Sequence, residues 1–281
     1  MLLEPAFTDL IRSALAEDIG NGDHSTLACI PADARGGARL KIKEDGILAG
    51  MEVAAAIFNL LDPSSVFKPF KKDGDSMKAG EVAFEVEAAV HTLLMGERLV
   101  LNCMQRMSGI ATLTSQYVNI LKGYHTRLLD TRKTTPNFRL LEKEAVRIGG
   151  GVNHRMGLYD MVMLKDNHID FAGGITAAVN KTVAYLQEKQ LPLQIEVETR
   201  NLEDVKEVLA VGQVHRIMLD NFSPAQISEA LTLIDGRYET EASGGINLKT
   251  LEEYAKTGVD YVSVGAVIHH AVSLDLSLKA I

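Results

Sequence analysis

The stretch from Asp130 to His168, DTRKTTPNFRLLEKEAVRIGGGVNHRMGLYDMVMLKDNH, contains the clearest structural pattern in the chain. Short apolar runs at 128–130 and 161–164 are too brief for helices and predict two buried strands. Between them, residues 136–147 predict a helix, with proline at its start and three glycines beyond its end. The stretch is therefore predicted to fold as one strand–helix–strand unit.

Basic side chains follow both predicted strands. Arg132 and Lys133 come directly after the first strand, and Lys165 comes directly after the second. His154 and Arg155 lie between them. Cations that converge in a partly buried cleft lose their hydration, and a bound anion is the simplest compensation. The alternative is a structural ion-pair network with the nearby carboxylates Asp130, Asp160 and Asp166.

The composition limits the classes of function. With 281 residues, 46% of them hydrophobic, the chain can bury a sizeable core. Its net charge of -8 argues against a nucleic-acid or anionic membrane surface. The sequence has no apolar run of about 18 residues, so no membrane span is expected. Cys29 and Cys103 are widely separated and lack metal-ligand spacing, so we expect two inert thiols in a reducing cytoplasm.

The N-terminal part predicts an α+β domain over residues 1–112. Glu4 and Asp9 interrupt the first apolar pattern, which favours an amphipathic helix over a signal peptide. Alternating residues at 38–42 and 82–87 predict strands. Further helices are predicted at 53–61 and at 92–121. Arg98 lies within the second of these, where a surface ion pair is the ordinary role of a lone arginine.

Residues 113–281 predict a second domain of repeated strand–helix units. After the opening unit, strands are predicted at 193–198, 217–219, 238–242 and 261–264, with helices between them. Such repeats indicate a parallel sheet, closed or nearly closed into a barrel. The last residues, 268–281, are expected to form a helix that packs on the first domain.

Chemically distinctive residues follow the predicted strands. In a barrel, the residues after the strands surround a single mouth, where binding and catalytic groups collect. The sequence therefore predicts one functional site at this end of the strands. In chain order, its candidate residues are Thr131, Arg132, Lys133, Lys165, Glu198, Asp220, Ser243, Gly244, Gly245, Gly265 and Ala266.

Three kinds of ligand group fit these residues. Gly244, Gly245 and Gly265 precede predicted helices and offer backbone N–H groups to a phosphate. An arginine side chain binds a carboxylate or a phosphate through two parallel hydrogen bonds. The candidates here are Arg98, Arg132 and Arg155. A phosphorylated sugar together with a polycarboxylate would use both sets.

Glu198 and Asp220 suit sugar hydroxyls or a divalent metal better than acid–base catalysis beside a phosphate. Glu196 shares the face of Glu198, so either glutamate could be the functional acid. A salt bridge to Lys133 or Lys165 is the structural alternative.

The chain resembles quinolinate phosphoribosyltransferases. The resemblance covers nearly the whole chain, and its central block is long enough to be specific. It implies an α/β fold, with an incomplete (β/α) TIM-like barrel beside an N-terminal α+β sandwich-like domain. Small departures occur at Asn137, where glycine is common, and at Thr199, where valine is usual. The matching stretches are EDIGNGDHST, ERLVLNCMQRMSGIAT, the central block through Ile169, IEVET, IMLDN, EASGGI and GVDYVSVGAVIHH.

The resemblance also implies residue roles. Arg132, Arg155 and His154 would bind the two quinolinate carboxylates, joined by Arg98 from a neighbouring subunit. Lys133 and Lys165 would meet the pyrophosphate and the substrate acid, beside Thr131. Glu198 and Asp220 would hold the ribose hydroxyls, directly or through Mg2+. The 5-phosphate would lie against the remaining turn residues, Ser243, Gly244, Gly245, Val264, Gly265 and Ala266.

The implied activity is phosphoribosyl transfer from phosphoribosyl pyrophosphate to quinolinate, with loss of CO2, in de novo NAD biosynthesis. The implied assembly is a cytoplasmic homodimer with a shared active site, or a hexamer built from it. Two alternatives remain. One is a related phosphoribosyltransferase acting on another acid or base, such as the homologous protein found beside molybdate transport genes. The other is a non-catalytic sensor of phosphorylated ligands.

Overall fold

The computed structural model describes residues 5–281 and divides into two compact units. The first unit contains the chain up to Ser115, together with Thr134–Gly150 and Val267–Ile281. The second contains Gln116–Lys133 and Gly151–Ala266. Of the predicted N-terminal apolar pattern, Glu4 lies outside the described residues, and the helix runs from Pro5 to Ile19.

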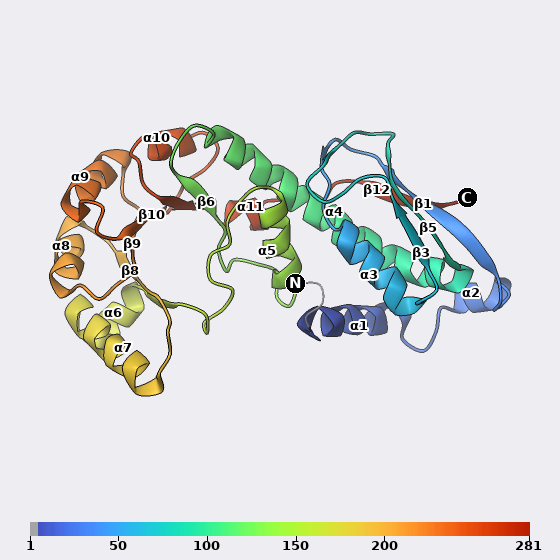
Figure 1. Cartoon of the computed structure of the whole chain (residues 1–281), viewed down its shortest axis with the longest axis horizontal. Helices are drawn as coiled ribbons and strands as arrows, with labels where there is room; N and C mark the ends of the chain where they lie inside the picture. The colour runs from blue at the N-terminus through green and yellow to red at the C-terminus, as the bar shows by residue number, and fades with distance from the viewer. Residues whose placement is uncertain (1–4) are drawn as a thin grey trace. The chain divides into compact units, whose positions relative to one another are not determined.

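A four-stranded antiparallel sheet forms the centre of the first unit (Figure 1). Its strand order is β12 (Leu276–Ala280), β1 (Arg35–Ile42), β5 (Val82–Ala89) and β3 (Val66–Pro69). A separate short pair joins β2 (Gly46–Ile47) to β4 (Ser76–Met77). The helices are α1 (Pro5–Ile19), α2 (His24–Cys29), α3 (Met51–Leu61), most of α4 (Val90–Ile120) and α5 (Arg139–Ile148).

Helices α3 and α4 pack closely because a glycine lies between them. A Cβ atom at Gly96 would come within 3.2 Å of the Phe58 ring and 3.1 Å of Leu61. Phe58 in turn contacts Phe84 of the sheet edge to face, with ring centroids 6.3 Å apart. This contact joins the helices to the sheet in one core, as the predicted α+β pattern requires.

The prediction of a helix over 268–281 is wrong. Helix α11 spans only Ala266–His269, and the residues that follow form strand β12, which pairs antiparallel with β1. Leu276 and Leu278 are buried, while Lys279 points away from the core and is exposed. This alternation is a strand pattern, and the unpaired edge of β1 gives it backbone partners.

The segment Thr134–Gly150, including helix α5, belongs to the first unit, whereas the sequence pattern placed it in the barrel. The end of α5 lies directly against α4. A Cβ atom at Gly149 would lie 2.5 Å from the Ala111 carbonyl oxygen and 2.7 Å from Thr114. Only glycine permits this approach, so the glycine run after α5 serves helix packing as well as helix termination.

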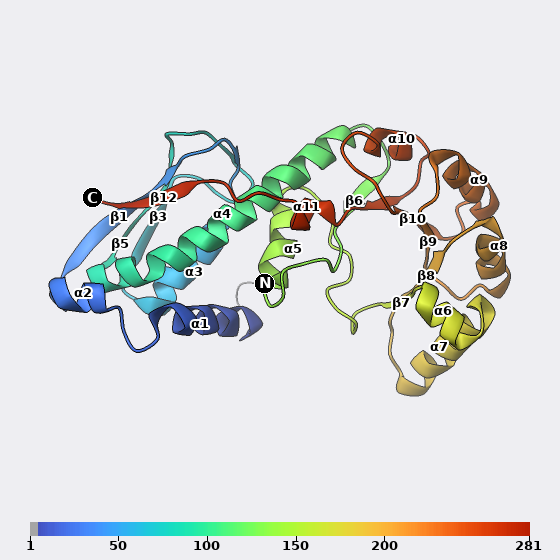
Figure 2. The ribbon, with the colours of Figure 1, turned by 180° about the vertical axis from the view of Figure 1, so that it is seen from behind.

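The second unit is built on a six-stranded sheet in which every pairing is parallel. The sheet is open, with β6 and β7 as its edges, and helices line its outer side (Figures 1 and 2). The predicted α/β class is confirmed. The strand order is β6 (Arg127–Leu129), β11 (Tyr261–Ser263), β10 (Glu239–Ser243), β9 (Arg216–Asp220), β8 (Ile195–Thr199) and β7 (Val162–Leu164). The helices are α6 (Asp166–Ala172), α7 (Ile175–Lys189), α8 (Leu202–Val211), α9 (Pro224–Ile234) and α10 (Leu251–Ala255).

The two faces of this sheet differ in chemistry. Alternate residues such as Val197, Ile217 and Leu219 are fully buried and apolar. Their neighbours along the strands point to the opposite face and are mostly charged or polar. The pairing register places on this polar face Glu196, Glu198, Arg216, Asp220, Glu239, Glu241 and Ser243. One face of the sheet therefore forms a core, and the other carries the candidate site.

Within residues 5–281, no helix combines the length and the apolar character needed to cross a lipid bilayer.

Candidate active site

The C-terminal ends of the parallel strands bring the predicted residues of the second unit to one edge of the sheet. Glu198 lies near the end of β8, and Asp220 and Ser243 end β9 and β10 as a directly paired couple. Lys165 follows β7 and Gly265 follows β11. The sequence-based expectation of a common edge is met by these residues, because all six strands run in the same direction.

Two carboxylates and a lysine form one part of this edge. Lys165 Nζ lies 3.9 Å from Glu198 Oε2. Burial raises the pKa of Glu198, and the charge of Asp220 raises it further. Two neighbouring carboxylates form a donor set that a hard divalent cation would stabilise. The pair therefore fits a magnesium ion or the hydroxyl groups of a sugar.

The turn after β10 is shaped by glycine. Gly244 has φ +98°, and a Cβ atom there would lie 2.2 Å from Asn221 Oδ1 and 3.0 Å from Asn221 N. Asn221 itself is held by two bonds, from its N–H to the Ser243 carbonyl at 2.8 Å and from its amide to Asp220 Oδ2 at 2.6 Å. The turn is thus packed against the end of β9, and no side chain fits at position 244.

The glycines of this turn do not open a helix directly. The sequence pattern predicted a helix from Asn247, but residues 247–250 form a turn in which Asn247 N–H donates to Thr250 Oγ1 at 3.1 Å. Helix α10 begins at Leu251. The backbone N–H groups of the turn, and not a helix dipole, are what Ser243–Gly245 can offer an anion.

Two arginines form the cationic part of the site. Burial lowers the pKa of Arg155 and the charge of Arg132 lowers it further, while Glu196 and Asp160 raise it. Arg155 donates to the Met161 carbonyl oxygen at 3.1 Å through one guanidinium nitrogen. Arg132 Nε is buried and has no hydrogen-bond partner among the described residues. Two close guanidinium groups with donors to spare are the arrangement that a carboxylate ligand would complete.

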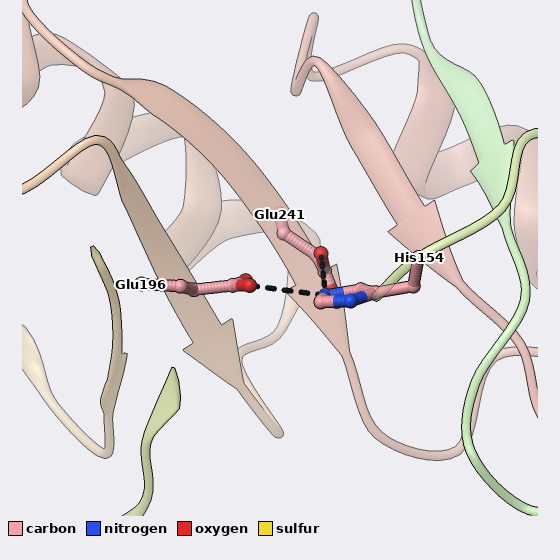
Figure 3. Close-up of side chains that lie close together, drawn as sticks. All are labelled: His154, Glu196 and Glu241. Atoms are coloured by element: carbon pink, nitrogen blue, oxygen red, sulfur yellow. Dashed lines mark ion pairs between the residues drawn. The ribbon is translucent and has the colours of Figure 1, made fainter. Parts of the chain in front are cut away.

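His154 lies in the segment between β6 and β7, and its side chain meets Glu196 of β8 and Glu241 of β10 in a buried cluster (Figure 3). Its Nε2 atom is 3.0 Å from Glu196 Oε2 and 3.3 Å from Glu241 Oε2. Arg216 supplies positive charge to this cluster, 3.4 Å from Glu241 Oε2 and 2.9 Å from Glu239 Oε2. The Arg216 guanidinium also lies over the Tyr261 ring, 4.4 Å from its centroid. The cluster is therefore close to electrically balanced.

The other ring nitrogen of His154 is also occupied. The backbone N–H of Arg155 donates to Nδ1 at 2.6 Å. Burial lowers the pKa of His154, whereas the neighbouring Glu196 and Glu241 raise it in so far as they are ionised. A second proton on the ring would have to occupy Nδ1, where it would displace the hydrogen bond from the Arg155 backbone N–H. Because burial and Glu241 raise the pKa of Glu196 to about 7, the geometry favours Glu196 as the carrier of this proton.

His154, Glu196 and Glu241 are also the one group of described residues with metal-ligand geometry, each offering an atom within 4.8 Å of the others. Arg216 already supplies positive charge there, and His154 Nε2 already contacts both carboxylates. The three side chains are held together by ion-pair contacts, while Glu196 Oε1, Glu196 Oε2 and Glu241 Oε1 are buried without a hydrogen bond among the described residues. Glu196 therefore lies in this buried cluster, whereas Glu198 lies near the end of β8 at the edge of the sheet.

The remaining predicted residues occupy separate places. Lys133 is exposed, and its backbone N–H donates to Thr131 Oγ1 at 3.1 Å. Arg98 is exposed on α4 of the first unit. Its entry into an active site from a neighbouring subunit stays a prediction. Val264 is tied to the end of β6 by its N–H bond to the Leu129 carbonyl at 3.0 Å.

Sequence reasoning missed Glu241 and Arg216. Both are buried charged residues inside short strands. The signal was present, since Glu241 stands two residues before Ser243, as Glu196 stands two residues before Glu198. A spacing of two places such pairs on one face of a strand.

Comparisons with known proteins agree across the whole chain. A family model described as the C-terminal domain of quinolinate phosphoribosyl transferase matches residues 110–279, and the model of its N-terminal domain matches residues 23–108. A tobacco protein named quinolinate phosphoribosyltransferase [decarboxylating] 2b, mitochondrial, is 44% identical over 96% of this chain and 81% of its own length.

Two further relatives are bacterial. A Synechocystis protein named probable nicotinate-nucleotide pyrophosphorylase [carboxylating] is 47% identical, covering 96% of this chain and 91% of its own. The crystal structure of NadC from Streptococcus pyogenes superposes with a TM-score of 0.91 at 41% identity, covering 99% of both chains.

Proposed function

The chain belongs to the quinolinate phosphoribosyltransferase family, and we propose that the edge of its parallel sheet, from Thr131 to Ala266, is where it carries out the family's reaction. The enzyme transfers the phosphoribosyl group of phosphoribosyl pyrophosphate to quinolinate with loss of CO2. The products are nicotinate mononucleotide and pyrophosphate, in de novo NAD biosynthesis.

The proximity of Arg132 and Arg155 is the observation that carries the assignment of the quinolinate site. Burial and the charge of Arg132 lower the pKa of Arg155, Glu196 and Asp160 raise it, and a bound anion would further stabilise the two guanidinium groups. The buried Nε of Arg132, which has no partner among residues 5–281, marks where that anion would sit. A planar dicarboxylate meets two planar guanidinium groups with paired hydrogen bonds. The backbone N–H of Arg155 donates to Nδ1 of His154, which helps to hold Arg155 in place.

The phosphoribosyl half of the substrate is assigned to the other end of the edge. Glu198 and Asp220 would hold the ribose hydroxyls, directly or through Mg2+, which would also neutralise the pyrophosphate charge. The backbone N–H groups of Ser243–Gly245 and Val264–Ala266 would bind the 5-phosphate. This assignment is supported by the turn at Gly244, where the backbone packs against Asn221 so closely that a side chain would not fit.

The residues act mainly by positioning and charge. The quinolinate nitrogen attacks the ribose C1 through a transition state with oxocarbenium character, while pyrophosphate leaves toward Lys133 and Lys165. A single preorganised donor of this kind contributes about 3–4 kcal/mol to transition-state stabilisation. The 2-carboxylate then leaves as CO2, because the quaternised ring nitrogen accepts the electron pair. No covalent intermediate with the enzyme is needed.

The assembly and location extend the proposal. Arg98 would complete the dicarboxylate site of a neighbouring subunit, which implies a homodimer or a hexamer built from dimers. The two unpaired cysteines, one exposed and one buried, suit a reducing cytoplasm.

The test is an assay with magnesium, quinolinate and phosphoribosyl pyrophosphate that follows nicotinate mononucleotide and CO2 together. Equal amounts of both products are expected. Nicotinate in place of quinolinate is expected to give no product, because it lacks the second carboxylate. Turnover of nicotinate at a comparable rate would reject the dicarboxylate site.

A further inference from the structure

The segment that carries Arg155 has no regular secondary structure. Between the isolated bridge at Val152 and the start of β7 at Val162, the chain forms only turns and bends. Leu158 and Tyr159, within it, are 72% and 71% exposed. The position of Arg155 must therefore come from specific bonds and not from a helix or a sheet.

Two carboxylates make most of those bonds. Asp130 accepts the backbone N–H of His154 at 2.8 Å and the side-chain amide of Asn153 at 2.6 Å. Asp160 accepts the backbone N–H groups of Met156 and Gly157 at 2.6 and 2.8 Å. These bonds hold the chain on both sides of Arg155, but the N–H of Arg155 itself donates to the imidazole of His154.

The imidazole can accept that bond only in one orientation. Nδ1 must face the Arg155 amide without a proton, so the ring proton must be on Nε2. A buried Nε2–H group needs an acceptor, and the carboxylate oxygens nearest to it are those of Glu196 and Glu241, at ion-pair distances of 3.0 and 3.3 Å. The side chain of His154 is 5% exposed and those of both glutamates are 0% exposed. Water is therefore not a ready substitute.

We propose that Glu196 and Glu241 are positioning residues of the active site: by binding Nε2–H of His154 they fix its tautomer, so that Nδ1 holds the backbone of Arg155 and aims its guanidinium at the quinolinate carboxylates. Glu196 and Glu241 touch no substrate in this arrangement. They act through His154 and Arg155. The inference rests on the proposed function for the identity of the ligand, but its structural part concerns the protein alone.

Glu196 is the better residue to change, since Glu241 also pairs with Arg216. Glu196→Met keeps the approximate volume and removes the acceptor. Glu196→Gln keeps an oxygen that can accept from Nε2–H. Met218→Leu is the matched control, because Met218 is a buried neighbour on the same face, paired with Glu198 and Glu241, and has no polar side-chain atom.

The kinetic expectation is a split between the two substrates. Misplacing Arg155 should raise KM for quinolinate by roughly tenfold or more in Glu196→Met, while KM for phosphoribosyl pyrophosphate changes less than about threefold. Glu196→Gln and Met218→Leu should stay within about threefold of wild type for both substrates. An unchanged quinolinate KM in Glu196→Met, an equal rise in both KM values, or an equal loss in Glu196→Gln would each overturn the proposal.

A spectroscopic measurement on the wild-type enzyme tests the structural part without activity. In protein labelled with 15N-histidine, His154→Asn identifies the His154 ring signals by their loss. We expect an unprotonated Nδ1 and a protonated Nε2 at neutral pH. A protonated Nδ1 would refute the positioning role even if Glu196→Met fails to fold. If the enzyme shows no turnover of quinolinate while this tautomer is observed, the assigned reaction fails and the positioning of Arg155 stands.

Discussion

Arg106 directs two guanidinium nitrogens at a single carboxylate oxygen of Glu142, with distances of 2.9 Å from Nε and 2.8 Å from Nη2. The same arginine donates to the carbonyl oxygens of Ile268 and Ala271, each at 2.8 Å. Glu142 is fully buried and also accepts the N–H and the hydroxyl of Thr135. Within the first unit, this pair ties helices α4 and α5 to the segment that leads into strand β12.

Removing Glu142 should therefore destabilise the first unit strongly. Glu142→Ala leaves Arg106 without its carboxylate and two Thr135 donors without an acceptor, which we expect to cost about 3–5 kcal/mol in the free energy of unfolding. Urea denaturation measures the loss. Arg147→Ala is the control, since Arg147 pairs with Glu144 from a side chain that is 64% exposed, and its loss should cost at most about 1 kcal/mol. Equal costs in both variants would contradict this account.

Arg132→Ala should abolish quinolinate turnover and leave the fold intact. The buried Nε of Arg132 has no hydrogen-bond partner among the described residues, so the replacement removes no hydrogen bond at that atom. We therefore expect a melting temperature close to that of wild type. Arg132→Lys should remain severely impaired, because an ammonium group cannot replace a planar pair of donors. Near-normal activity in the alanine variant would reject the assignment of this residue.

Gly244→Ala should weaken the binding of phosphoribosyl pyrophosphate. The added Cβ atom would lie 2.2 Å from Asn221 Oδ1 and 3.0 Å from its backbone nitrogen, at φ +98°. The turn must then move, and we expect KM for phosphoribosyl pyrophosphate to rise by about tenfold or more, since displaced binding groups are costly.

Gly236→Ala is the control that separates the effect of backbone strain from the effect of displacing the turn. Gly236 also has a positive φ, +67°, but a Cβ atom there would meet nothing within 4 Å, and it lies outside the proposed site. Its replacement should cost about 1 kcal/mol of stability and leave both KM values unchanged. If the two alanine variants raise KM alike, the phosphate site does not lie in this turn.

The succession of strands along the chain and the residues at their ends could be predicted from the sequence, because short apolar runs in a repeating strand–helix pattern define both. Lys165, Glu198 and Asp220 were found in this way, and the structure places them at one edge of the sheet. Residues that follow the strands meet at one edge whenever all the strands are parallel. This prediction needs no knowledge of tertiary contacts.

Buried charge and the assignment of segments to units could not be predicted in the same way. Glu241 and Arg216 lie inside strands, where the sequence shows only a charged residue among apolar ones, and their meaning depends on which strands become neighbours. Strand β12 was mistaken for a helix because its five residues acquire a partner only when the chain returns to β1. Both errors concern contacts between residues far apart in the sequence.

The two cysteines should differ sharply in reactivity. Cys29 is exposed, whereas Cys103 is 1% exposed and burial raises its pKa to about 12. We expect a thiol reagent at pH 8 to label one cysteine in the folded protein and both after denaturation. Because the pKa of Cys103 is higher in the folded state, its contribution to stability is complete below about pH 9 and is lost as the pH rises toward 12. Cys103→Ala should make the alkaline loss of stability shallower, as measured by unfolding between pH 8 and 11, while Cys29→Ala should not. Rapid labelling of both thiols in the folded enzyme would contradict the burial of Cys103 in helix α4.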